Sequence, residues 1–167
     1  MFKSEVYFSC RLILQKPLQL QEAVNILPVF RNLDNHIYIA CSRLFAAHKT
    51  PEKVLEILKE FEEEKVIYIT VAGRSNALSA FVDANTSKPV IACPPYSEKF
   101  GGADIFSSLR VPSGIGSLVT VEPEGAAIAA AKILALADKE LEKRVVSYQS
   151  AKKKAIEKAN DAVKKLK

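Results

Sequence analysis

Short apolar runs and amphipathic stretches alternate along this chain of 167 residues. The apolar, β-branched runs predict buried strands at residues 5–10, 36–41, 66–71, 90–93 and 118–121. Apolar positions at helical spacing predict helices that begin at Thr50-Pro51, run over residues 75–84, and open at Pro123 and extend to about Ala137. Strands that alternate with helices are typical of a parallel sheet covered by helices on both faces. The pattern therefore predicts an α/β fold.

A long last helix is predicted from Asp138 onward. Its apolar positions form one stripe, made of Leu141, Val145, Tyr148, Ala155, Ala159, Ala162 and Leu166. This stripe must dock either on its own domain or on a neighbouring subunit. The chain therefore divides into an α/β domain over residues 1–138 and an amphipathic helix over residues 139–167.

The composition, 49% apolar and 26% charged residues, is ordinary for one soluble globular domain. The densest apolar stretch, residues 126–137, is short and carries Lys132, which argues against a membrane span. Glu5 and Arg11 interrupt any signal-peptide core. Three cysteines lie in or beside apolar runs without CxxC spacing, which favours free thiols in a reducing compartment. We therefore expect a cytoplasmic protein.

The net charge of +5 raises the question of nucleic-acid binding. Residues 151–167 hold seven lysines against Glu157 and Asp161, so this segment accounts for the whole excess. A lysine-rich terminal helix is most often a solvated face. No aromatic residue follows Tyr148 that could stack on a base. We therefore expect no nucleic-acid partner.

Residues 72–79 follow the strand predicted at 66–71 and combine a glycine, a cation and small polar residues. Such a strand end lets the backbone approach a ligand and then enter a helix, and open α/β sheets place their chemistry there. The alternative is a tight turn capped by Ser75 or Asn76. The pattern alone does not separate the two.

His48 follows the second predicted strand, and we expect it at the same sheet edge as Arg74. A histidine there can exchange a proton near neutral pH, and Lys49 and the adjacent helix start favour an anionic ligand. The alternative is a histidine that only closes a turn. The other histidine, His36, begins an apolar strand and is interpreted as structural.

The region over residues 93–114 is too long and too rich in glycine and proline for a plain connector. Its Ser107, Ser108 and Arg110 offer donors to anionic groups, although an ordered loop that covers a subunit contact is an equal alternative. The chain has no Walker A or GxGxxG pattern, no metal-ligand spacing and no GxSxG elbow. We therefore expect neither a cofactor nor a metal.

Four blocks of this sequence, in this order, resemble the aminoimidazole ribonucleotide (AIR) carboxylases of purine biosynthesis. They are Ala47-His48-Lys49, Ala72-Gly73-Arg74-Ser75-Asn76-Ala77-Leu78, Cys93-Pro94-Pro95 and Ser107-Ser108-Leu109-Arg110-Val111-Pro112-Ser113-Gly114. The Arg74-Ser75-Asn76 version looks like the class II enzymes, which use CO2 directly. Class I mutases carry a glycine and a second histidine in this stretch and act on a carbamate.

The resemblance implies reversible addition of CO2 to C4 of 5-aminoimidazole ribonucleotide on a three-layer, flavodoxin-like αβα sandwich. His48 would carry the C4 proton, and Lys49 would meet phosphate or carboxylate charge. Ser75 and Asn76, with the backbone of Ala72 and Gly73, would orient CO2 and the ring. Class II members are usually metal-free homotetramers with sites built between subunits. A tetramer is therefore expected here, with an octamer as the alternative.

The first part of the chain departs from this family. A Gly-Ser-x-Ser-Asp block should end the first strand and hold the nucleotide's phosphate and ribose, but no glycine precedes Gly73. Ala46 also replaces a serine of the family. Either residues 9–45 reflect an altered reading frame, or the protein is an oligomeric relative with impaired catalysis. Both interpretations stay open beside an active class II enzyme and a class I-type mutase.

Overall fold

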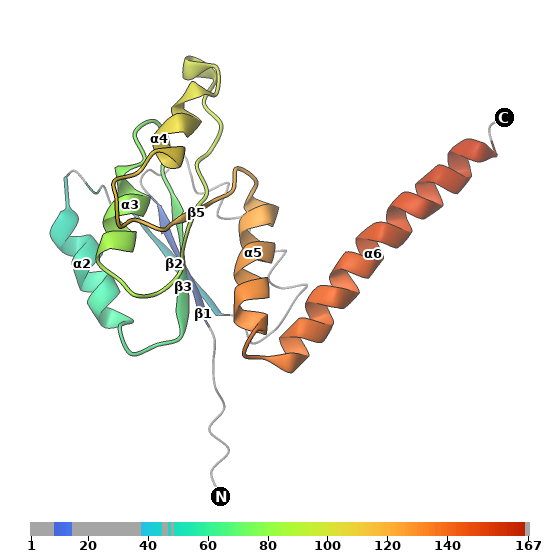
Figure 1. Ribbon diagram of the computed structural model, residues 1–167, viewed down its shortest axis with the longest axis horizontal. Helices are drawn as coiled ribbons and strands as arrows, with labels where there is room; N and C mark the ends of the chain where they lie inside the picture. Colours follow the sequence, from blue (N-terminus) through green and yellow to red (C-terminus); the bar gives the residue numbers. More distant parts are fainter. Residues whose placement is uncertain (1–8, 15–37, 45–46, 48, 166–167) are drawn as a thin grey trace, which may run out of the picture.

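The computed structural model describes residues 9–14, 38–44, 47 and 49–165 (Figure 1). Five strands form one parallel sheet in the order β2-β1-β3-β4-β5. They are β1 (Ser9–Leu14), β2 (Tyr38–Leu44), β3 (Val66–Val71), β4 (Val90–Ala92) and β5 (Leu118–Val119). This order is that of the flavodoxin-like doubly wound sheet, so the predicted α/β class is confirmed.

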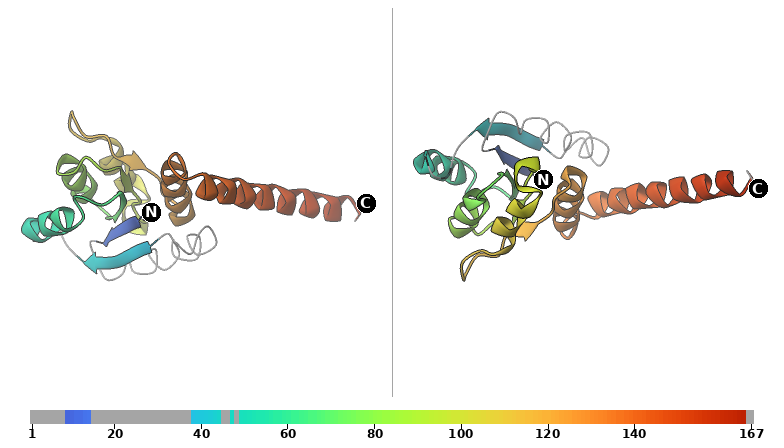
Figure 2. Two further views of the ribbon diagram at one scale, coloured as in Figure 1. Left: turned by 90° about the horizontal axis from the view of Figure 1, so that it is seen from below. Right: turned by 90° about the horizontal axis from the view of Figure 1, so that it is seen from above.

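Helices cover both faces of the sheet, as Figures 1 and 2 show. The α-helices are α2 (Pro51–Glu60), α3 (Ala77–Ala84), α4 (Phe106–Leu109), α5 (Pro123–Ala135) and α6 (Lys139–Lys164). Two 3-10 turns, η2 (Glu98–Phe100) and η3 (Ala103–Ile105), precede α4 in the long connection after β4. Helices α2 and α3 pack on one face, and α5 with the start of α6 packs on the other. The three layers are therefore helix, sheet and helix.

Strand β3 joins the two halves of the core. All six of its residues are buried. Ile67, Ile69 and Val71 pack in the cluster that contains α5, whereas Val66 and Tyr68 pack in the cluster that contains α2 and α3. This alternation is what a strand covered on both faces requires.

Helix α5 faces the sheet with small side chains. Its four fully buried alanines are Ala126, Ala127, Ala130 and Ala131. Because alanine adds little volume, the helix axis can approach the sheet closely, and Leu134 fills the space nearer its end. This helix therefore packs within the chain's own core.

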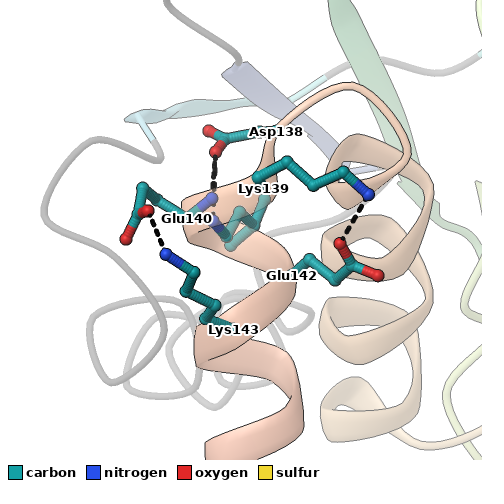
Figure 3. A network of polar contacts seen from close by, with 6 residues as sticks. Asp138, Lys139, Glu140, Glu142 and Lys143 are labelled. Atoms are coloured by element: carbon teal, nitrogen blue, oxygen red, sulfur yellow. Dashed lines mark hydrogen bonds and ion pairs between the residues drawn. The ribbon is translucent and has the colours of Figure 1, made fainter.

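Helix α6 leaves the body of the molecule soon after it begins (Figures 1 and 2). Asp138 caps it: its Oδ1 accepts hydrogen bonds from the backbone N–H groups of Glu140 at 2.9 Å and Leu141 at 3.0 Å. Figure 3 shows this cap with the exposed ion pairs Lys139–Glu142 and Lys143–Glu140. Only Leu141 and Val145 are buried, and every described residue from Ser150 onward is exposed.

The apolar stripe of α6 therefore docks on its own domain only at its start. Ala155, Ala159 and Ala162 are exposed, and Leu166 lies outside the described residues. None of the helices in the described part of the chain combines the length and the apolar character that crossing a bilayer requires.

Some element bounds differ from those expected. Of the first strand, predicted at residues 5–10, residues 5–8 lie outside the described residues; β1 continues to Leu14, and it pairs with β3 from Ser9 to Leu14. The helix predicted from Ser75 begins at Ala77, with Asn76 as its N-cap. Thr50 is the N-cap of α2 as expected, but its side chain makes no capping hydrogen bond.

Candidate active site

The loops that follow the strands meet at one edge of the sheet. All strand pairs are parallel, so every strand presents its carboxyl end there. Strand β2 lies on one side of β1, and the chain then crosses over to β3 on the other side of β1. The strand order therefore reverses between β1 and β3, and the gap beyond their carboxyl ends is the topological switch point. Ligands of doubly wound sheets bind in this crevice. The loop that follows β3, residues 72–76, lies at this point.

This loop presents two polar side chains at the edge. Ala72 is fully buried and Gly73 is half-buried, whereas Arg74 and Ser75 are exposed. Arg74 has a φ of 65°, in the left-handed region that costs an L-residue about 1–2 kcal/mol. An arginine held there needs support from its surroundings.

The connection after β4 supplies that support. The Arg74 N–H donates to Asp104 Oδ2 at 3.1 Å, and the Ser107 hydroxyl lies 2.7 Å from the Arg74 carbonyl oxygen. Ser107 Oγ also lies 2.8 Å from the Asp104 carbonyl oxygen and accepts from the Asn76 N–H at 3.2 Å. Because a hydroxyl has one proton, Ser107 donates to these carbonyls one at a time. The two loops thus form one hydrogen-bonded unit.

Asn76 is buried at the centre of this unit, with 4% of its surface exposed. Its Oδ1 accepts from the Ser79 N–H at 3.3 Å and caps α3, while its Nδ2 donates to Ser108 Oγ at 2.8 Å. Ser108 is also buried. The expectation of a turn capped by Asn76 is therefore confirmed, and it coexists with an exposed polar edge formed by Arg74 and Ser75.

The other residues predicted for the site lie on neighbouring loops. Lys49 is exposed between β2 and α2, at the same edge of the sheet. Arg110 is exposed at the end of α4. His48 lies outside the described residues, as do residues 15–37, which make up most of the segment 9–45 that was expected to depart from the family pattern.

A cavity of about 240 Å³ lies beside the hydrogen-bonded unit. Its lining is Pro94, Pro95, Tyr96, Gly102, Asp104, Ile105, Val121 and Glu122. Asp104 therefore lies between the Arg74 loop and this cavity. Among the described residues, no group of three or more His, Cys, Asp or Glu side chains could hold a metal ion.

A second polar cluster joins α5 to α6. Glu124 accepts a hydrogen bond from the Tyr148 hydroxyl and lies 2.8 Å from Lys152 Nζ. Lys152 Nζ also lies 5.3 Å from the centre of the Tyr148 ring. The hydrogen bond from Lys152, and to a lesser extent that from Tyr148, holds the pKa of Glu124 below its ordinary value. Burial and then the hydrogen bond to Glu124 raise the pKa of Tyr148.

The sequence matches the profile of the AIR carboxylase family over residues 22–155. The chain is 61% identical over 125 residues to the phosphoribosylaminoimidazole carboxylase of Archaeoglobus fulgidus. The aligned stretch covers 75% of this chain and 69% of that protein. The Treponema denticola enzyme of the same name is 52% identical over 111 residues, 65% of this chain and 70% of that one.

The fold is also similar to a crystal structure of Treponema denticola PurE. The TM-score is 0.89 at 40% sequence identity, and the match covers 94% of this chain and 99% of that one. The likeness therefore extends over nearly the whole of both chains.

Proposed function

Because this chain belongs to the AIR carboxylase family, we propose that it adds CO2 reversibly to C4 of 5-aminoimidazole ribonucleotide in purine biosynthesis. The observation that carries the proposal is the pair of loops at the switch point. Arg74-Ser75-Asn76 and Ser107-Ser108 belong to the blocks that resemble the family, and they are hydrogen-bonded to each other. The enzyme is thus a carboxy-lyase. We propose that it acts in the cytoplasm.

The chemistry requires a base and an oriented electrophile. The aminoimidazole ring is electron-rich and attacks CO2 through C4, after which the C4 proton must leave. We propose that His48 takes this proton, because an imidazole exchanges protons near neutral pH. In the reverse direction the same group would return the proton to C4.

The binding roles follow from charge and position. Lys49 and Arg110 are exposed cations that can meet the phosphate and carboxylate charges. Ser75 and the backbone of Ala72 and Gly73 would orient CO2 and the ring. Asn76 and Ser107 also belong to the proposed site, where their hydrogen bonds shape the loop around the substrate.

The test is the consumption of the aminoimidazole nucleotide as a function of bicarbonate or CO2. We expect His48→Asn to abolish it, because asparagine cannot take up a proton at neutral pH. His36→Asn, which removes the chain's other histidine, should retain activity. Absence of turnover by the wild-type protein at millimolar nucleotide would refute the proposal.

The same assay separates the two enzyme classes. A class II enzyme consumes the nucleotide with CO2 alone, whereas a class I-type mutase requires the carbamate. We expect CO2 to suffice, because Arg74-Ser75-Asn76 resembles the class II pattern. Turnover with the carbamate and none with CO2 would favour the mutase.

One observation favours a second candidate, a non-catalytic oligomeric relative. Strand β1 reads Ser-Cys-Arg-Leu-Ile-Leu, and the glycine-serine block expected near its end does not occur in the sequence. Loss of several charge-assisted hydrogen bonds, each worth about 1.5–3 kcal/mol, would weaken nucleotide binding by orders of magnitude. Calorimetry that detects no heat of nucleotide binding would favour this candidate.

We also propose a homo-oligomer, with a tetramer expected and an octamer as the alternative. Large apolar side chains are exposed on the connection after β4, including Tyr96 and Phe106, and on α6, including Ile156 and Val163. Exposed apolar groups of this size favour a protein contact. A second copy of the chain is the partner that the family resemblance implies.

A further inference from the structure

The backbone of Arg74 is unusual within the described part of the chain. It is the one non-glycine residue there with a positive φ, and it lies at the switch point of the sheet. Such strain persists only where neighbouring groups determine the conformation, and it concentrates at functional sites. Glycine would adopt this conformation without strain, yet the chain places a cation there.

Two side chains from a distant segment fix this conformation. The Arg74 N–H belongs to the peptide group before its Cα and donates to Asp104 Oδ2, while its carbonyl belongs to the next peptide group and accepts from Ser107. The dihedral φ is set by the first peptide plane and ψ by the second. The hydrogen bonds of Asp104 and Ser107 to these two peptide groups, here called the clamp, therefore hold both angles.

We propose that Asp104 is a positioning residue for the carboxylation site. Its carboxylate holds the Arg74 peptide in the left-handed conformation, and this directs the exposed side chains of Arg74 and Ser75 toward the substrate. Asp104 itself does not touch the reacting atoms. This inference rests on the proposed function, because the reaction supplies the groups that these side chains meet.

The kinetic consequence is a loss of rate more than of affinity. A displacement of about 1 Å at a reacting group can lower the rate by about 100-fold. We therefore expect Asp104→Ala to lower kcat by about 10- to 100-fold, with KM for the nucleotide changed by less than about threefold. Asp104→Asn should restore most of kcat, because its amide oxygen can accept the same N–H.

Asp83 provides a matched control. Its Oδ2 accepts the Gly116 N–H at 2.8 Å, so it ties the far end of the same connection to α3 through the same kind of bond. We expect Asp83→Ala to leave kcat near that of the wild type. An equal loss of kcat in both alanine variants would reduce Asp104 to general support of the loop and overturn the inference.

Hydrogen exchange tests the hydrogen bond between the Arg74 N–H and Asp104 without an activity assay. In Asp104→Ala the Arg74 amide should lose protection, whereas in Asp83→Ala the Gly116 amide should lose it. Retained protection of Arg74 in Asp104→Ala would overturn the clamp, even if the wild-type protein shows no turnover. Lost protection with an unchanged kcat would keep the clamp but overturn its role in positioning the reaction.

Discussion

Asn76 connects three separate features within one turn. Its side chain caps α3 through Ser79 and bonds to Ser108, and its backbone N–H reaches Ser107. Loss of an N-cap costs about 0.5–2 kcal/mol, and a buried polar group left without its partner costs about 1–3 kcal/mol. The stability of the loop pair therefore depends strongly on this one amide.

We expect Asn76→Ala to lower the free energy of unfolding by about 2–4 kcal/mol, measured by urea denaturation. The control is Asn85→Ala at the other end of α3, where the exposed amide donates to the Phe81 carbonyl at 2.7 Å. That bond is replaced by water when it is lost, so its removal should cost less than about 1 kcal/mol. Similar losses in the two variants would contradict the role of Asn76.

The residue-level site could be predicted in part. Glycine, arginine and small polar residues after a buried strand indicated either a capped turn or a site, and the cap at Asn76 is observed. The bond between Asp104 and the Arg74 backbone could not be predicted. It joins residues 30 positions apart and uses a backbone N–H, so no local pattern of side chains records it.

At the scale of elements, prolines and polar residues at helix starts predicted the bounds of helices better than runs of apolar residues predicted the bounds of strands. Pro51 and Pro123 mark the starts of α2 and α5 as predicted, and the last helix begins directly after Asp138, close to its predicted start. The first strand extends past its predicted end at residue 10, because apolar residues continue there to Leu14. Pairing with β3, from Ser9 opposite Val66 to Leu14 opposite Val71, determines its bounds.

The contact between α5 and α6 carries a pH prediction. The pKa of Glu124 is lowered, so its stabilising contribution is present above its ordinary value of 4.5 and is lost as the pH falls through the lower folded value. The pKa of Tyr148 is raised, so its contribution is present below 10.0 and is lost as the pH rises further. The cluster therefore stabilises the α5–α6 contact between these limits.

We expect Lys152→Met to raise the pKa of Glu124 toward its ordinary value by more than Tyr148→Phe does, because Lys152 is the larger cause. Side-chain carbon NMR during an acid titration measures both shifts. Lys154→Met, at an exposed position of the same helix, is the control for loss of a positive charge and should leave this pKa unchanged. A larger shift in Tyr148→Phe would reverse the assigned order.

At the scale of the whole molecule, the far half of α6 is exposed along its length. The sequence predicted an apolar stripe but left its partner open, because a stripe specifies a covered face and not the surface that covers it. Among the described residues, only the first turns of α6 are covered, by α5 and the core around it. A neighbouring subunit therefore remains the proposed partner for the rest.

We expect Ile156→Glu to lower the mass of the assembly, measured by light scattering, because it places a charge on an apolar contact. Ser150→Glu adds the same charge to the opposite, polar face of α6 and should leave the mass unchanged. An Ile156→Glu variant with the wild-type mass would show that this face of α6 makes no contact that the assembly requires.

The projecting helix also governs how a single chain moves through solution. Its 26 residues extend about 39 Å at a rise of about 1.5 Å per residue, whereas a compact body of roughly 100 residues, about the number described outside α6, has a radius of gyration of about 13 Å. A lone chain therefore experiences more friction and tumbles more slowly than a sphere of equal mass. It would elute early from a sizing column, and packing the helix against other copies would make the assembly relatively more compact. Elution volume consequently understates the difference in mass between one chain and its assembly.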